Sequence, residues 1–203
     1  MRKALFHLKR SDPVLRGIIS CVGPYRIAYA EPDFHTLAKS VVYQQLSGKA
    51  ALTIFGRLLD TARAGEGRLR PETLLRIKPA RLREAGLSQQ KSAYLTDLAQ
   101  RTVSGQLCFD RLPEMPDDEV IAHLTQVKGV GVWTAHMFLI FALRRPDVLP
   151  TGDLGVRSAI RRAYGFEELP TPREVEEVAG PWRPWCSVAS WYLWRSLEGV
   201  AAL

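Results

Sequence analysis

The sequence predicts an all-α fold, and three features of its 203 residues support this prediction. Apolar residues recur at helical spacing in most segments, while strand-like alternation over several residues is hard to find. Glycine and proline interrupt the pattern at short intervals, as expected for many short helices joined by turns. Hydrophobic residues make up 46% of the chain, which is enough to build a core and excludes disordered and fibrous classes.

The helices expected in the first half follow from their caps and breakers. Asp12-Pro13 is typical of an N-cap followed by proline at the first helical position, and Gly23-Pro24 ends that helix. Further helices are expected over about 33–45, 47–63, 79–85 and 88–103, with a loop at residues 65–67.

In the second half, Pro116-Asp117-Asp118 starts a helix that continues through Leu124. The segment 132–143 is apolar almost all round, which predicts a central buried helix. Two more helices are expected, from the turn at 150–153 to Tyr164 and over 184–197.

Composition gives a first indication of the partner. Lysine and arginine number 28 against 21 acidic residues, a formal net charge of +7. A basic excess favours a polyanionic partner, because each neutralised phosphate releases condensed counterions. A merely soluble basic protein has the same composition, so charge alone does not decide.

Cysteine and histidine usage indicates the compartment. The three cysteines form no CxxC pair and the four histidines show no metal-ligand spacing, so a disulfide framework or a cysteine-ligated cluster is not expected. The N-terminus does not resemble a signal peptide, and no segment of about twenty apolar residues could span a membrane. We therefore expect an intracellular protein, cytoplasmic or nucleoid-associated in a prokaryote and nuclear in a eukaryote.

A glycine hairpin lies between two expected helices, at Lys128-Gly129-Val130-Gly131. Gly129 and Gly131 allow positive φ and close backbone approach. The N–H groups that open the next helix then form an anion site, suited to phosphate. The alternative is an ordinary corner between two helices.

Asp153 precedes an apolar helix, so its first interpretation is an N-cap. That interpretation is compatible with a second one. A carboxylate beside helix N–H groups stays ionised, as an electrostatic stabiliser of a cationic transition state must.

Tryptophans form the third feature. Trp133 and Met137 are four positions apart and share one helix face, and Trp191 and Trp194 are three apart near the C-terminus, with small serines on the same side. Such clusters usually belong to the core. The functional alternative is a stacking pocket for a flat, electron-poor base.

Gln45 and Leu46 form the fourth feature, where the expected helix 33–45 ends. Leu46 points away from the apolar stripe of that helix. An exposed leucine is ordinary, but on a DNA-facing loop it would be a wedge that fills the gap left by an extruded base.

Taken in their order along the chain, these features resemble the helix-hairpin-helix DNA glycosylase superfamily, and within it the 3-methyladenine DNA glycosylase II group. The matching stretches span about residues 34–197 and are 41–48, 86–91, 127–135, 150–157 and 182–194.

The resemblance implies a role for each feature. The hairpin at 128–131 would grip a DNA phosphate, with a possible structural Na⁺ or K⁺ on the backbone at Val127 and Gly129. Asp153 would be the essential aspartate, and Gln45 and Leu46 would enter the duplex. The pocket for the extruded base would be lined by Trp133, Met137, Trp191 and Trp194.

The resemblance also indicates which type of glycosylase within the superfamily to expect. Relatives that cleave the strand carry a catalytic lysine where this chain has Trp133, which cannot form a Schiff base. The branch with an iron–sulfur cluster ends in four cysteines, whereas Cys186 is alone here, so no cluster and no required cofactor are expected. Lys128 replaces a common proline, Met137 replaces an aromatic residue, and the β-rich N-terminal lobe of some members is absent.

The resemblance therefore implies two helical lobes, 34–142 and 1–33 plus 143–203, with a cleft for DNA and base between them. The expected function is a monofunctional, monomeric glycosylase that releases alkylated purines, of the 3-methyladenine and 7-methylguanine type, from double-stranded DNA. The alternatives are a noncatalytic helix-hairpin-helix module that only holds DNA and a helical metabolic enzyme.

Overall fold

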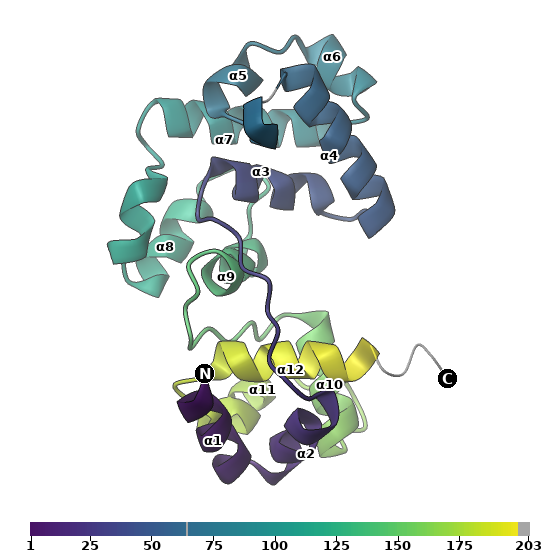
Figure 1. The fold of residues 1–203 in the computed structure, drawn as a ribbon, viewed down its shortest axis with the longest axis vertical. Coiled ribbons are helices and arrows are strands. Elements are labelled where there is room, and N and C mark those ends of the chain that lie inside the picture. The colour runs from purple at the N-terminus through teal and green to yellow at the C-terminus, as the bar shows by residue number, and fades with distance from the viewer. Residues whose placement is uncertain (64, 199–203) are drawn as a thin grey trace. The chain divides into compact units, whose positions relative to one another are not determined.

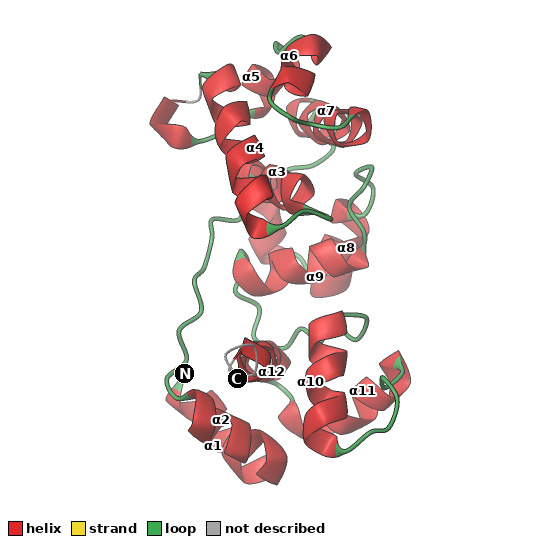
Figure 2. Cartoon of the chain, turned by 90° about the vertical axis from the view of Figure 1, so that its right-hand side faces the viewer, coloured by secondary structure: helices red, strands yellow, loops and turns green. Residues whose placement is uncertain are grey.

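The computed structural model describes residues 1–63 and 65–198, which contain helices and turns and no strand, so the all-α prediction is confirmed. The chain divides into two compact units (Figures 1 and 2). Unit 1 comprises residues 1–29 and 139–203, and unit 2 comprises residues 30–138. The predicted lobe boundaries, after residues 33 and 142, lie a few residues further along the chain. Residues 199–203 of the predicted second lobe lie outside the described residues.

Among the described residues of unit 1, two N-terminal and three C-terminal α-helices form the main body. These are α1 (Arg2–Ser11), α2 (Pro13–Val22), α10 (Leu154–Tyr164), α11 (Pro172–Ala179) and α12 (Cys186–Glu198). Helix α12 packs against both α2 and α10, and α1 packs against α2 (Figure 1). Their shared core includes Leu8, Leu15, Ile160, Trp182 and Tyr192, all almost fully buried.

A buried carboxylate joins three parts of unit 1. Asp12 is 6% exposed and caps α2 by accepting a hydrogen bond from the backbone N–H of Leu15 at 2.9 Å. Its other oxygen accepts from the Tyr164 hydroxyl at 2.6 Å and from the Trp182 indole N–H at 2.7 Å. The N-terminal helices are thereby tied to α10 and to the 3-10 helix Gly180–Trp182.

Unit 2 is organised around one long helix. Its elements are α3 (Phe34–Tyr43), α4 (Gly48–Ala62), α5 (Pro71–Leu75), α6 (Pro79–Glu84), α7 (Gln89–Val103) and α8 (Asp117–Leu124), with 3-10 helices at Gly65–Gly67 and Phe109–Glu114. Helix α7 packs against α3, α5 and α6, and α3 also packs against α4 (Figure 2). Ser88 caps α7 by accepting from the N–H of Lys91 at 3.2 Å.

Helix α9 (Val132–Phe141) begins in unit 2 and enters unit 1 at Leu139. Thr134, Ala135 and residues 138–140 are buried, so the prediction of a buried helix is right for half of its ten residues. It is wrong for the first turn, where Val132 and Trp133 are about half exposed, at 52% and 49%. An apolar segment does not reveal by periodicity which of its ends faces solvent.

Three helices were not expected from the sequence: α1, α5 and α11. For α11, the sequence does contain a signal that predicts a helix. Thr171 and Glu174 form a reciprocal capping box, a pattern that predicts a helix start. Helix α3 is shorter than expected because it ends at Tyr43. Among the described helices, none combines the length and apolarity that a bilayer crossing requires.

We predict that Asp12→Ala lowers the free energy of unfolding by about 3–5 kcal/mol, because it leaves buried donors without an acceptor. Urea unfolding followed by circular dichroism measures the change. Asp33→Ala is the matched control, since Asp33 caps α3 through the N–H of Thr36 at 3.0 Å but its side chain is 36% exposed. A loss for Asp12→Ala no larger than that for Asp33→Ala would contradict the role given to the buried network.

Candidate active site

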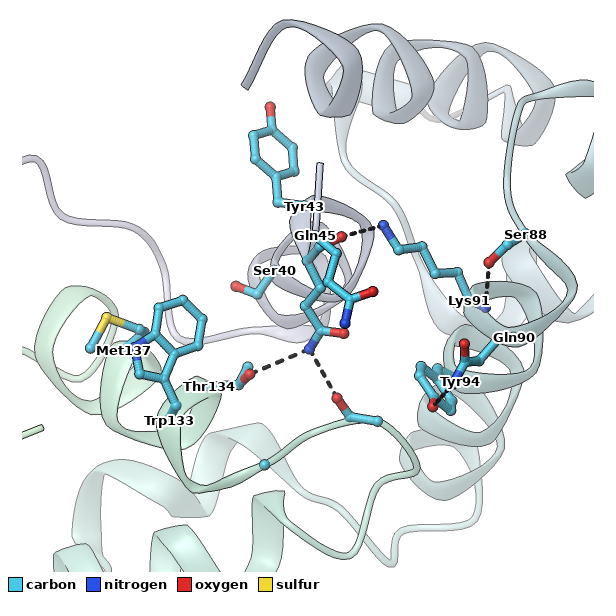
Figure 3. Close-up of a pocket in the computed structure, with 13 residues that line it drawn as sticks. Ser40, Tyr43, Gln45, Ser88, Gln90, Lys91, Tyr94, Trp133, Thr134 and Met137 are labelled. Atoms are coloured by element: carbon cyan, nitrogen blue, oxygen red, sulfur yellow. Dashed lines mark hydrogen bonds between the residues drawn. The ribbon is translucent and has the colours of Figure 1, made fainter. Parts of the chain in front are cut away.

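A cavity of about 630 Å³ opens beside the hairpin in unit 2 (Figure 3). It brings together several residues singled out in the sequence, namely Gln45, Gly129, Gly131, Trp133 and Met137. In Figure 3 the side chains of Trp133 and Met137 lie side by side, on the same stretch of α9. The sequence did not single out Ser40, Tyr43 or Thr134, which also line the cavity.

The hairpin depends on Gly129. Its φ of +79° is a conformation that favours glycine, and a Cβ atom there would lie 2.1 Å from the ring of Tyr94. Gly131 differs, because its φ is not in the left-handed region and nothing lies within 4 Å of a Cβ placed on it. The expectation that both glycines serve positive φ is therefore correct for Gly129 and wrong for Gly131.

Helix α7 holds the start of the hairpin. The backbone N–H of Lys128 donates to Asp97 at 2.9 Å, and Arg101 pairs with the same carboxylate at 3.0 Å. Burial opposes ionisation of Asp97, but these hydrogen bonds outweigh it, so the pKa of Asp97 is lowered. The Lys128 residue is exposed, and helix α9 starts just beyond it at Val132. The first N–H groups of α9 therefore follow the hairpin directly, as an anion site requires.

The resemblance places the monovalent cation at the backbone carbonyls of Val127 and Gly129. The Val127 carbonyl accepts from the N–H of Val130 at 3.0 Å, and the Gly129 carbonyl accepts from the side-chain amide of Gln44 at 2.9 Å. Both oxygens thus have a protein partner and neither is an orphaned polar atom that demands a cation. The cation remains a prediction from resemblance.

The loop that follows α3 carries the predicted wedge. Gln45 has a φ of +56°, unusual for a residue with a side chain, and Leu46 is 38% exposed. Ser47 begins α4 as its N-cap, accepting from the N–H of Ala50 at 3.4 Å. The loop is therefore a tight connection between two helices, with Gln45 and Leu46 at its exposed turn.

Asp153 lies in unit 1, where the residue is 8% exposed and its carboxylate accepts hydrogen bonds from two N–H groups. Its Oδ1 accepts from the backbone of Val156 at 2.8 Å, which caps α10, and from the Trp194 indole at 2.8 Å. The ring of Phe141 stacks on that of Trp194, with centroids 5.7 Å apart. The structure thus brings Asp153 and Trp194 together, as the interpretation of the sequence requires.

Gly155 makes this contact possible. A Cβ atom on Gly155 would lie 2.9 Å from Cδ1 of Trp194 and 3.1 Å from Oδ1 of Asp153, closer than a side chain could be placed without a shift. The sequence analysis missed Gly155, because its lack of a side chain matters only through a residue about forty positions away.

Trp191 has a different environment from Trp194. It is 7% exposed and packs edge-on against Tyr25, with ring centroids 4.7 Å apart, and against Tyr192 at 4.9 Å. These contacts place it in the core of unit 1. The structure therefore supports a packing role for Trp191, the usual one for a clustered tryptophan.

Comparison with known families shows which protein family this chain belongs to. The family model described as HhH-GPD superfamily base excision DNA repair protein matches residues 38–184, which include the hairpin, Asp153 and the cavity of unit 2. The chain belongs to this superfamily. The resemblance seen in the sequence is confirmed, and with it the enzyme class, a DNA glycosylase.

The similarity to individual HhH-GPD proteins extends over nearly the whole chain. DNA-3-methyladenine glycosylase 1 of Schizosaccharomyces pombe is 33% identical over 97% of this chain and 87% of its own length. The structure of that organism's 3-methyladenine DNA glycosylase, Mag1, in complex with abasic DNA superposes with a TM-score of 0.83 over 95% of both chains. A DNA-3-methyladenine glycosidase of Bacillus halodurans is 34% identical, with a TM-score of 0.86 over 98% of this chain and 91% of its own.

We predict that Gly155→Ala reduces base release from damaged DNA about 10- to 100-fold, because the added methyl group displaces the Trp194 indole from Asp153. Gly152→Ala is the matched control, since nothing lies within 4 Å of a Cβ at that nearby glycine. Single-turnover release of methylated bases measures both variants. Equal rates for the two variants would show that the contact between Trp194 and Asp153 does not matter for the reaction.

Proposed function

We propose that this HhH-GPD protein is a monofunctional glycosylase that acts as a monomer on double-stranded DNA and releases alkylated purines of the 3-methyladenine and 7-methylguanine type. The observation that carries the proposal is the carboxylate of Asp153, held at 2.8 Å by both the N–H of Val156 and the indole of Trp194. The named relatives support the substrate class, since the Schizosaccharomyces pombe and Bacillus halodurans proteins are both named as 3-methyladenine enzymes.

The carboxylate of Asp153 suits the chemistry of glycosidic bond cleavage. Two N–H donors stabilise its negative charge and fix its direction. As the bond from C1′ to the purine nitrogen breaks, its electron pair leaves with the base and positive charge develops on the sugar. A water oxygen then bonds to C1′ and loses a proton. Asp153 would stabilise the positive sugar, accept that proton, or do both in sequence.

Trp133 and Met137 supply the second requirement, recognition of the damaged base. Alkylation of a ring nitrogen makes the purine cationic, which improves it as a leaving group and as a partner for an indole face. Trp133 is 49% exposed at the cavity of unit 2, so its ring has accessible surface for stacking. Stacking of a base on an aromatic ring contributes about 1–3 kcal/mol.

The remaining elements are assigned to DNA binding. The hairpin at 128–131 would hold a phosphate with backbone N–H groups, and Lys128 would add a positive charge nearby. Gln45 and Leu46 would enter the duplex as the damaged nucleotide leaves it, which costs least for a weakly stacked base. Trp133 occupies the position of the lyase lysine, so the product is an abasic site in an intact strand.

The main alternative is a noncatalytic module that only holds DNA. It accounts for the charge and the hairpin, but not for a carboxylate oriented by an indole. Incubation with methylated duplex DNA separates the two, because a glycosylase releases free bases and leaves alkali-sensitive sites. Strand breaks without alkali would instead indicate a lyase.

We predict that Asp153→Asn lowers the single-turnover rate of base release at least about 100-fold while its affinity for undamaged duplex DNA stays within about two-fold. The neutral amide keeps the size of the side chain but loses the charge that opposes the positive sugar. Chromatography of released bases and fluorescence anisotropy of labelled DNA measure the two quantities.

Glu167→Gln provides the control, since it removes one negative charge from an exposed position of the same unit. Its rate is expected to match that of the wild type. Near-normal release by Asp153→Asn would remove this residue from the mechanism.

A further inference from the structure

Lys91 on α7 reaches the end of another helix of unit 2. Its ammonium group donates to the backbone carbonyl of Val42 at 2.6 Å and to that of Gln44 at 2.6 Å. Carbonyls in the last turn of a helix have no partner within that helix, and they carry the negative end of its dipole. The side chain of Lys91 therefore caps α3 from outside.

This cap lies directly before the predicted wedge. Helix α3 ends at Tyr43, Gln44 is its C-cap, and Gln45 then adopts a φ of +56°. Helices commonly end with glycine in that left-handed conformation, because a side chain disfavours it. Here the residue is glutamine, so the loop needs stabilisation from elsewhere. The two hydrogen bonds from Lys91 provide it.

The same face of α7 also holds the hairpin. Three positions beyond Lys91, the ring of Tyr94 lies against Gly129, and three further on Asp97 accepts from the backbone N–H of Lys128 at 2.9 Å. Residues three apart along a helix lie on one side of it. One row of side chains thus contacts both the loop after α3 and the hairpin.

Gln44 joins these two elements directly. Its side-chain amide donates to the carbonyl of Gly129 at 2.9 Å and lies 3.4 Å from the hydroxyl of Thr134, while its own carbonyl is held by Lys91. In Figure 3, one dashed line ends at the labelled Thr134 and another begins at the ammonium group of the labelled Lys91. A shift of the loop would therefore break contacts with both the hairpin and α7.

We propose that Lys91 is a positioning residue that fixes the loop of Gln45 and Leu46 relative to the phosphate-binding hairpin, so that its loss impairs extrusion of the damaged nucleotide. This inference rests on the proposed function. Lys91 acts through the backbone of the loop and takes no part in bond cleavage. Its effect depends on how much extrusion the substrate requires, whereas a general loss of structure would affect all substrates alike.

The test compares two substrates that carry the same methylated purine, one opposite a normal base and one opposite an abasic site. For Lys91→Met, single-turnover base release is expected to fall about 10-fold on the paired substrate and less than about two-fold on the other, because an unpaired base is extruded more easily. Lys91→Arg, which retains donors for both carbonyls, is expected to restore most of the rate. An equal loss on both substrates, or no loss on either, would overturn the proposal.

Lys78→Met is the matched control, since it removes the same charge from an exposed position of unit 2. It should behave like the wild type on both substrates. Thermal melting establishes that each variant is folded. If Lys91→Met does not fold, Lys91→Gln replaces it, because glutamine is too short to reach both carbonyls.

Hydrogen exchange of the peptide spanning residues 42–50 tests the same inference without catalysis. Faster exchange in Lys91→Met than in Lys78→Met is expected, and equal exchange would overturn the positioning role. A wild-type protein that releases no base would refute the proposed function, while the exchange experiment would still report on Lys91. The two failures are thus distinguishable.

Discussion

In the proposed mechanism, the chemistry depends on the acceptor Oδ1 of Asp153. It receives one N–H from the first turn of α10 and one from the indole of Trp194, each at 2.8 Å. The first hydrogen bond is an ordinary N-cap and would exist in many proteins. The second requires α12 to approach the start of α10 closely, which only the absence of a side chain at Gly155 allows. The position of Asp153 thus lets its carboxylate cap α10 and be oriented by Trp194 at the same time, and neither role excludes the other.

The hairpin of unit 2 likewise depends on a glycine at a close contact. Gly129 is required twice, once for its positive φ and once because Tyr94 occupies the space of a Cβ atom. Asp97 places a negative charge next to a segment assigned to phosphate, which would be unfavourable if that charge were uncompensated. Its hydrogen bonds with the Lys128 backbone N–H and with Arg101 supply the compensation, so the carboxylate fixes the hairpin with its charge partly balanced.

The sequence revealed most of the helices and the residues of the site that their types mark chemically. The sequence predicted the helix starts at Asp12-Pro13 and Ser88, because capping depends on local residues. It also drew attention to Asp153, because an aspartate before an apolar helix has few roles. Trp191 and Trp194 could not be told apart, since both lie on one helix three positions apart. Their difference comes from neighbours distant in the chain, Tyr25 for one and Asp153 for the other. Gly155 and Lys91 were missed for the same reason, because their partners are set by packing.

Two of the residues that sequence analysis missed differ in how they act: Lys91 acts on the backbone of another helix, and Gly155 acts through its lack of a side chain. Lys91 is a lysine in the sequence, yet its charge serves the carbonyls of α3 rather than a nucleic acid. Partial burial lowers its pKa, which is unfavourable for a group meant to neutralise phosphate but acceptable for a donor to backbone carbonyls. Lys91 is therefore a positive charge that serves the fold, whereas Lys128 is exposed beside the hairpin, where the proposed function places a phosphate.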